Sequence, residues 1–179
     1  GQFEAARAGS TTATALAQQQ FAALLKADAG NPLYLVYYGS TFALQGRDSR
    51  APWTRIRLIH EGLGYIDRGL AGVAATQRNG GADAEMETRL VAIATFLALP
   101  DAIFHRLDDA RRQLQQALSG SSFMAASRDL QGHMIYESAL LARSDHDATA
   151  ERSALQKVLA LSPPSVDLAE VRARLAELH

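Results

Sequence analysis

The chain has 179 residues, of which 47% are hydrophobic and 21% are charged, and its formal net charge at pH 7 is −1. These values are typical of a folded protein with a hydrophobic core, and they exclude both intrinsic disorder and a strongly basic surface for nucleic acid. The absence of cysteine excludes disulfides, a thiol nucleophile and thiolate metal ligands. The longest apolar run, from Leu90 to Leu99, is too short to cross a bilayer.

The first residues bear on where the protein works. The chain starts Gly1-Gln2 rather than with Met, so we expect native residues to precede Gln2. A cleaved secretion signal and a cut within a longer protein both explain such a start. With a bacterial source assumed, we favour a periplasmic or exported location over a cytoplasmic one.

Helix start, stop and periodicity signals divide the chain into about eight helical segments after a poorly ordered or capping segment at residues 1–9. We expect helices at residues 10–29, 31–46, 52–77, 83–99, 103–118, 122–143, 147–161 and 166–178. Arg78-Asn79-Gly80-Gly81 is the clearest turn between them. No alternating stretch of strand length persists, so the sequence predicts a single all-α domain over residues 1–179 with short loops between antiparallel helices.

The segment from Asn31 to Gly46 has the strongest helix signals. Asn31 can cap the first N–H groups, and Pro32 suits the first turn. Gly39 permits close approach of a neighbouring helix, and Gly46 is expected to end the helix at a positive φ. The segment therefore predicts one half of a helical hairpin.

A recurring pattern of small and apolar residues at four-and-three spacing indicates close packing between helices. The expected packing residues are Ala17, Phe21, Leu35, Tyr38, Gly39, Phe42, Gly62, Ile66, Gly69, Ala94, Ala110, Leu114, Ala117 and Ala139. A small residue in this pattern lets two helix axes approach, and the flanking apolar residues fill the groove beside it.

On these residues the chain resembles the tetratricopeptide repeat (TPR) family. Leu35, Tyr38, Gly39, Phe42 and Gly46 match the first helix of that motif, and residues 154–163 resemble its second helix with the proline that follows. The spacing departs from the family period of about 34 residues, and the middle helices lack the glycine–aromatic pair. The resemblance implies a divergent TPR-like solenoid of antiparallel helix hairpins, with about three helical pairs and a capping helix.

The same resemblance implies a non-enzymatic interaction module or adaptor that binds a peptide or helix of a partner protein in a concave groove. Carried over by alignment, the groove would be lined by Leu33, Val36, Tyr37, Ser40, Thr88, Val91, Thr95, His133, Tyr136 and Arg143. The lysine and asparagine residues with which some family members hold a terminal carboxylate are missing. Self-association of the chain remains a further alternative.

The aromatic residues divide between core and surface. Tyr34, Tyr37 and Tyr38 cannot all face the core, because successive residues of a helix point about 100° apart. We expect Tyr38 to pack beside Gly39 and one of the other two to have an open face that anchors a peptide. Trp53 follows Pro52 at a helix start and is expected to pack against its hairpin.

Two histidine clusters define the alternative class, a helical enzyme or small-molecule-binding protein. One is His60 with Arg57 and Glu61 on a single helix, and the other is His105 with Asp101 and Asp109 four residues away on either side.

A third histidine, His133, has Glu137 at i+4, which supplies two of the ligands that a metal site needs. No second pair completes such a site, and the glycines and serines match no phosphate loop or nucleophile elbow. We therefore expect no catalytic residue, metal or cofactor.

Overall fold

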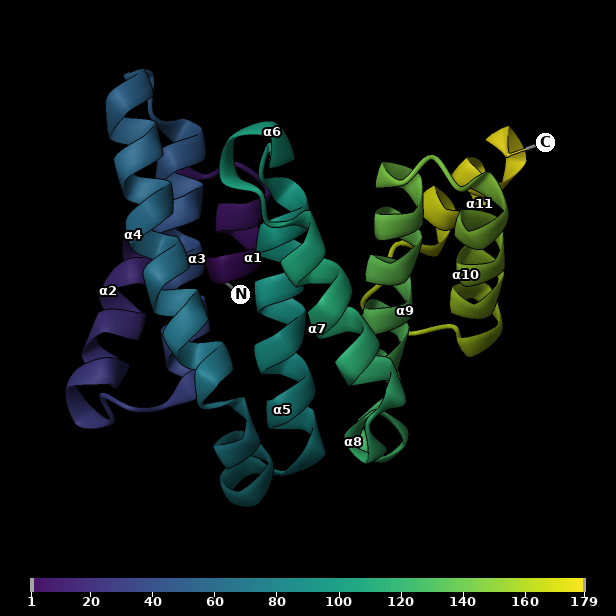
Figure 1. Cartoon of the computed structure of the whole chain (residues 1–179), viewed down its shortest axis with the longest axis horizontal. Helices are drawn as coiled ribbons and strands as arrows, with labels where there is room; N and C mark the ends of the chain where they lie inside the picture. Colours follow the sequence, from purple (N-terminus) through teal and green to yellow (C-terminus); the bar gives the residue numbers. More distant parts are fainter. Residues whose placement is uncertain (1, 179) are drawn as a thin grey trace. The chain divides into compact units, whose positions relative to one another are not determined.

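The computed structural model describes residues 2–178, and it describes the side chains of all of these residues except 75–80. Helices form most of the backbone in this part of the chain. Eleven helices are assigned there (Figure 1). They are α1 (Gln2–Arg7), α2 (Thr11–Ala27), α3 (Pro32–Asp48), α4 (Pro52–Ala71), α5 (Val73–Ala98), α6 (Asp101–Phe104), α7 (Leu107–Ser119), α8 (Ser121–Ala125), α9 (Arg128–Ser144), α10 (Ala148–Leu161) and α11 (Leu168–Glu177). The all-α prediction is confirmed for these residues.

The chain divides into two compact units, Gly1–Asn79 and Gly80–His179. Unit 1 contains α1 to α4 with the beginning of α5, and unit 2 contains the rest of α5 with α6 to α11.

The predicted starts of α2 and α3 are confirmed by their caps. The Ser10 side chain accepts a hydrogen bond from the backbone N–H of Ala13 at 3.2 Å, which satisfies one of the free donors of the first turn. The Asn31 side chain accepts from the N–H groups of Leu33 and Tyr34 at 3.1 and 3.2 Å. The N-caps of α10 and α11 are Asp147 and Asp167, whose carboxylates accept bonds from first-turn amides in the same way.

Glycines mark three boundaries differently from the prediction. Gly46 does not end α3, which continues to Asp48, because this glycine is a packing residue of the helix interior. The long helix predicted to Gln77 ends earlier, at Ala71, and α5 begins after Gly72. Three residues of the turn predicted at residues 78–81, namely 78–80, have side chains outside the described part of the chain. The fourth residue, Gly81, interrupts α5 with a φ of 76°.

Two predicted helices of unit 2 are each split in two. The 103–118 segment is interrupted at His105, whose left-handed backbone (φ 52°) ends α6, and the Asp101 side chain then accepts the N–H of Leu107 at 2.8 Å where α7 begins. The 122–143 segment is interrupted at residues 126–127. Here the Asp83 carboxylate of α5 accepts the Ser127 N–H at 2.6 Å. This side-chain oxygen takes the place of the backbone carbonyl that would accept the N–H in a continuous helix.

Helices α3 and α4 lie side by side (Figure 1) and meet through facing glycines. A Cβ atom added to Gly39 would lie 2.5 Å from the carbonyl oxygen of Gly62 and 2.8 Å from Cγ1 of Ile66. One added to Gly62 would collide with the Gly39 carbonyl in return, and one added to Gly46 would lie 2.6 Å from Cγ1 of Ile59. Only glycine permits this backbone separation, so the close approach expected at Gly39 is present and extends along the whole hairpin.

Most of the expected packing residues are buried. Ala17, Leu35, Gly39, Phe42, Gly62, Ile66, Gly69, Ala110, Leu114, Ala117 and Ala139 are buried, and Phe21, Tyr38 and Ala94 are half-buried. In unit 2 a hydrophobic cluster joins α9, α10 and α11 through the buried side chains of Ala139, Leu155, Val158 and Val171. The four-and-three spacing therefore located buried positions in both units.

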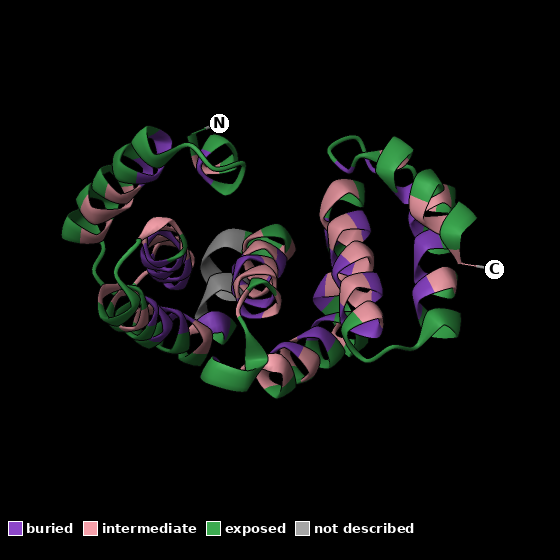
Figure 2. Ribbon diagram, turned by 90° about the horizontal axis from the view of Figure 1, so that it is seen from above, coloured by how far each residue is buried: buried purple, intermediate pink, exposed green. Residues whose placement is uncertain are grey.

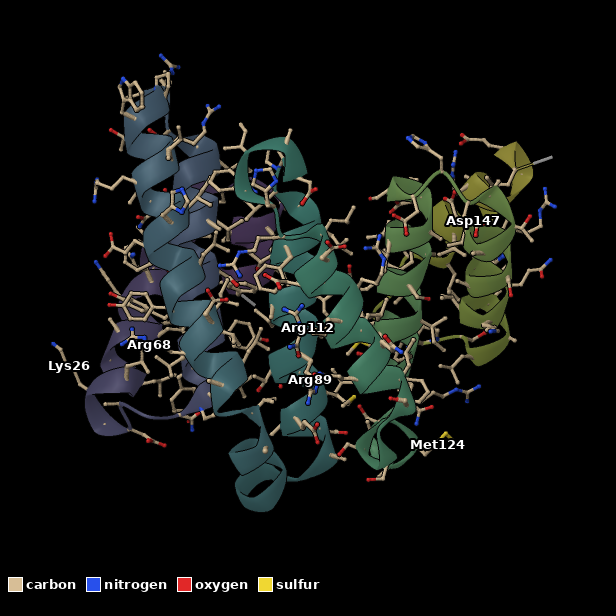
Figure 3. The ribbon with its side chains drawn as sticks, in the orientation of Figure 1. Lys26, Arg68, Arg89, Arg112, Met124 and Asp147 are labelled. Atoms are coloured by element: carbon tan, nitrogen blue, oxygen red, sulfur yellow. The ribbon has the colours of Figure 1, made fainter. Side chains whose placement is uncertain are left out.

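A nearly buried polar network joins α5, α7 and α8 in unit 2. The Arg89 guanidinium pairs with Glu85 one turn earlier at 3.2 Å and donates to the side-chain oxygens of Gln113 and Gln116 on α7 (Figure 3). The second Glu85 oxygen accepts the Ser122 hydroxyl of α8 at 2.5 Å. Each charged group has a partner within the network, which connects the three helices and offsets the cost of burying the Arg89 and Glu85 charges.

Candidate partner-binding site

Several residues aligned to the TPR groove are buried. On α3, Val36 is fully buried and Ser40 is 2% exposed, and on α5, Thr88 is fully buried and Val91 is 8% exposed. Leu33 and Thr95 are half-buried. The buried residues cannot contact a partner in this conformation.

Tyr37 is half-buried in a cluster of three aromatic rings from three helices. Its ring stacks on Phe21 of α2 with centroids 4.6 Å apart and an interplanar angle of 4°. Phe3 of α1 contacts this stack edge-on, at 4.7 Å from Tyr37 and 6.2 Å from Phe21. We call Phe21 and Tyr37 the aromatic seat, because their stacked rings accept the ring of a third helix. Tyr37, one of the two tyrosines expected to have an open face, is thus contacted by the chain's own α1.

Arg47, at the end of α3, binds the other end of α1. Its guanidinium donates to the carbonyl oxygens of Ala6 and Arg7 at 3.0 and 2.9 Å, and Asp48 holds it in place at 2.7 Å. These carbonyls lie in the last turn of α1, where a cation is favourable, and the Ala6 oxygen also accepts the N–H of Gly9 at 3.0 Å. The aromatic seat and Arg47 together bind both ends of a short helix.

Tyr38 lies in a separate aromatic cluster of the α3–α4 hairpin. Its ring contacts Phe42 at 5.1 Å and Tyr65 at 4.8 Å, both edge-on, and the Arg68 guanidinium lies 4.4 Å from the centroid of the Tyr65 ring. Burial raises the pKa of Tyr38, and the nearby Tyr65 and Glu61 raise it further. Tyr38 and Tyr37 therefore use different sides of α3.

The three groove residues expected on α9 all contact the C-terminal segments of unit 2. Tyr136 donates to Glu170 of α11 at 3.3 Å, and burial followed by this carboxylate raises the pKa of its hydroxyl. Arg143 donates to the carboxylate of Glu151 at 2.7 Å, and His133 contacts Ser165 at 2.6 Å. This face of α9 is a packing surface within the chain.

Glu151, which is 2% exposed, is the centre of an ion triad between α9, α10 and α11. Arg174 of α11 binds both carboxylate oxygens, at 2.8 and 3.0 Å, while Arg143 of α9 binds one. Hydrogen bonds from Arg174 are the main reason that the pKa of Glu151 is lowered, with those from Arg143 adding to them against the opposing effect of burial. A bidentate arginine of this kind fixes both position and orientation, so the triad holds α11 on the α9–α10 pair.

Asp129, His133 and Ser165 form a polar cluster that resembles a catalytic arrangement in composition only. Ser165 donates its hydroxyl to Asp129 at 2.6 Å, and its backbone N–H donates to the same carboxylate at 3.0 Å. Burial alone would raise the pKa of Asp129, but the two bonds from Ser165 and the charge of His133 outweigh it and lower the pKa. Because the serine proton is bound by the carboxylate, His133 must donate to the serine oxygen and cannot act as its base. The cluster therefore clasps the 162–167 connection onto α9.

The two histidine clusters predicted from sequence do not assemble as sites. His105 is exposed, while Asp109 binds Arg106 at 2.7 Å and Asp101 binds the Leu107 amide. His60 and the Arg57–Glu61 pair, whose charged atoms are 3.5 Å apart, lie on an exposed side of α4. Among the described residues, no three histidine, aspartate or glutamate side chains approach closely enough to hold a metal ion.

Large apolar side chains reach solvent at a few places. Trp53, which was expected to pack against its hairpin, is instead 84% exposed because it precedes the part of α4 that crosses α3. Met124 of α8 is 78% exposed (Figure 3), and Ile103 of α6 is 54% exposed. Single exposed apolar residues are common on folded proteins and do not by themselves mark a site.

The sequence reasoning missed the contribution of Phe3 and Arg47. Phe3 lies in residues 1–9, which were expected to be a poorly ordered or capping segment, whereas Gln2–Arg7 form α1, and the spacing of Phe3 and Ala6 places both on one side of this helix. That spacing was the available signal. Arg47 lies just beyond Gly46, where the helix was expected to end, whereas α3 continues to Asp48.

Comparisons with models of known protein families, with curated protein sequences and with solved structures find no match to this chain. Within the described part of the chain, no helix combines the length and apolar character needed to span a bilayer.

Proposed function

We propose that this protein is a non-enzymatic interaction module that binds a short helix of a partner protein, with the aromatic seat and Arg47 as its binding site. The observation that carries the proposal is the docking of α1 on α2 and α3, because it places a helix on this surface with contacts at both ends. Binding of short amphipathic helices through an aromatic anchor is a common mode of peptide recognition.

The α3–α4 hairpin supports this proposal by making the site rigid. Tyr37 and Arg47 both belong to α3, and α3 is fixed against α4 by the contacts of Gly39 and Gly46. A binding surface on such a helix loses little conformational entropy when a partner docks. The resemblance of residues 31–46 to the first helix of a TPR motif points to the same class of function.

The alternative of an enzyme or a small-molecule-binding protein gains no support from the described residues. His60 and His105 are both exposed, and their neighbouring acidic groups have other partners. We therefore retain the interaction module as the only proposal.

A selection with displayed peptides tests the proposed function without knowledge of the natural partner. A random peptide library is selected for binding to the full chain and counter-selected against the Tyr37→Ala variant. We expect enriched sequences with an aromatic residue on one side of a helical pattern, because the seat selects a ring. Their binding should survive Tyr37→Phe, which keeps the stack on Phe21.

The folded state of Tyr37→Ala is checked by circular dichroism and by the exchange of α4 amides. A library from which no peptide emerges with Tyr37-dependent binding would contradict the proposed function. Peptides that bind equally to Tyr37→Ala and to the unchanged chain would place a binding surface elsewhere and also contradict it.

A further inference from the structure

We infer that α1 is an internal ligand of the α2–α3 face, which a partner helix of the same chemistry replaces. This inference rests on the proposed function and specifies the ligand. The expected partner segment has an aromatic residue, a small residue three positions later and a glycine-terminated last turn, as in Phe3, Ala6 and Gly9.

Each of these features has a counterpart in the site. The ring of Phe3 is held by the aromatic seat, and Ala6, which has no exposed surface, permits close approach of the helix backbone. The last turn of α1 places the carbonyls of Ala6 and Arg7 opposite the guanidinium of Arg47. The site therefore recognises a ring, a short side chain and the C-terminal end of a helix.

Gly9 supplies the backbone shape at that end. Its φ is 106°, and the N–H groups of Gly9 and Ser10 bond back to the carbonyls of Ala6 and Ala5 at 3.0 Å each, as in a Schellman helix end. This geometry strongly favours glycine. A partner helix with another residue at this position would present its last carbonyls to Arg47 less well.

The contacts of α1 are few enough for another helix to displace it. Ala6 is its only buried residue, Phe3 is half-buried, and the remaining described residues of α1 are exposed. Figure 2 shows this helix, beside the N label, as mostly exposed. The ion pair of Arg7 with Glu4, at 3.7 Å, lies within α1 itself and adds nothing to docking. A six-residue helix is unstable in water, so α1 unfolds when it leaves the site.

Release of α1 leaves the rest of unit 1 complete. The bonds from Gly9 and Ser10 amides belong to the end of α1, whereas α2 starts from the side chain of Ser10, which binds Ala13. A Cβ atom added at Gly9 would meet nothing within 4 Å, so the connection is open to solvent. The chain can therefore open at Gly9 without loss of a cap on α2.

The tethered segment reduces the apparent affinity for a free peptide. A short connection gives an effective concentration on the order of millimolar. The apparent dissociation constant of a competing peptide equals its intrinsic value divided by the fraction of molecules with an empty site. Variants that weaken only the docking of α1 must therefore raise the affinity of the chain for an added peptide.

The probe is the synthetic peptide of residues 2–10, acetylated and amidated, titrated into the ¹⁵N-labelled full chain and followed by NMR chemical shifts. Two variants weaken α1 without touching α2 or α3. Phe3→Ala removes the anchor ring, and Ala6→Asp places a charge at the buried contact. For both variants we expect the apparent dissociation constant to fall, by about fivefold for Phe3→Ala, with shifts concentrated at Phe21, Tyr37 and Arg47.

Three controls make the result specific. Trp53→Ala, which removes an exposed apolar side chain elsewhere in unit 1, should leave the peptide affinity of the chain unchanged. A peptide with Ala in place of Phe should not bind Phe3→Ala, and Tyr37→Ala added to Phe3→Ala should abolish binding. Retention of the α3 and α4 amide shifts shows that each variant is folded.

The inference is overturned if neither Phe3→Ala nor Ala6→Asp, both folded, binds the peptide more tightly than the unchanged chain does. It is also overturned if binding persists when Tyr37 is removed. If the peptide of residues 2–10 fails these tests while peptides from the library selection still require Tyr37 for binding, the proposed function stands. Only the inference that α1 resembles the partner helix is then rejected.

Discussion

Each unit docks a short helix against a helical pair, but the two short helices are held by different forces. In unit 1, α1 is held by the edge of the Phe3 ring and by two bonds from Arg47 to its carbonyls. In unit 2, α11 is held by the Glu151 triad, and its buried Val171 belongs to the hydrophobic cluster with α9 and α10. The side chain of Tyr136 adds a further bond to α11.

This difference indicates which short helix can leave. Removing α11 would expose an apolar cluster and separate a buried carboxylate from one of its two arginines, which is costly. Removing α1 exposes one alanine, part of the Phe3 ring and the parts of Phe21 and Tyr37 that this ring contacts, and the carbonyls that it frees can bond to water. The face of unit 1 is therefore suited to exchange, whereas the corresponding face of unit 2 is structural.

The largest expected effect tests the platform on which α1 lies. Gly39→Leu should destabilise unit 1 by about 3 kcal/mol or more, because even a Cβ atom would meet the Gly62 carbonyl at 2.5 Å. The matched control is Gly64→Ala on α4, whose Cβ would meet nothing within 4 Å and which should stabilise by up to about 1 kcal/mol. Chemical denaturation, with hydrogen exchange measured at the α3 amides, gives the stability of each variant. Equal stability changes for Gly39→Leu and Gly64→Ala would contradict the close crossing of α3 and α4.

The next effect concerns the attachment of α11. Glu151→Gln should destabilise unit 2 by about 2 kcal/mol, less than a fully buried pair would lose because both arginines are partly solvated. Hydrogen exchange should rise at α10 and α11 while the exchange of α3 stays constant. An unchanged rate at α11 would show that the hydrophobic cluster alone secures this helix.

Acidification provides a pH test of the same triad. The pKa of Glu151 is lowered in the folded chain, so its contribution to stability is complete above the unfolded carboxyl pKa of about 4.3 and is lost as pH falls through the folded value. The stability difference between the unchanged chain and Glu151→Gln should therefore be constant near neutral pH and shrink below about pH 4. A difference that grows in acid would contradict the assigned sign.

A smaller effect is expected at the clasp of residues 162–167. Ser165→Ala removes the hydroxyl bonds to Asp129 and His133 and should cost about 1 kcal/mol, with faster exchange confined to the beginning of α11. Ser144→Ala, on an exposed side of α9, is the matched control. If Ser165→Ala leaves exchange at Val171 unchanged, the clasp does not position α11.

A similarly small effect on stability is expected for Phe3→Ala. Loss of one edge-on ring contact should lower the stability of unit 1 by about 1 kcal/mol, because the seat itself remains stacked. Tyr fluorescence and the melting temperature measure this change. Unfolding of α2 and α3 by this substitution would show that α1 is an integral part of the core and would end the contrast with α11.

The sequence predicted the parts of the fold that depend on local chemistry and spacing. Asn31 and Pro32 located the start of α3, and the spacing of Gly39, Gly62 and Gly69 located a hairpin contact. It failed at His105, where a non-glycine residue adopts a left-handed backbone and a side chain from the preceding turn starts the next helix. Such a break depends on tertiary contacts and leaves no periodicity signal.

The candidate site was predicted only in part, for a similar reason. Helical geometry indicated only that Tyr34 or Tyr37 has an open face, and the family resemblance implied that Tyr37 lines the groove. Whether the face of Tyr37 is open depends on a segment that lies more than thirty residues away along the chain. Arg47 illustrates the same limit, because its role required α3 to continue past Gly46. Burial of Val36 and Thr88 also arises from packing that the alignment to a repeat motif did not contain.

The central claim is that the aromatic seat binds a short helix from outside once α1 is weakened. An isotope-filtered NOE experiment on labelled Phe3→Ala chain with unlabelled peptide of residues 2–10 tests it most directly. We expect intermolecular NOEs from the peptide phenylalanine ring to the rings of Phe21 and Tyr37. NOEs at other residues under saturating peptide, or none at all, would contradict it.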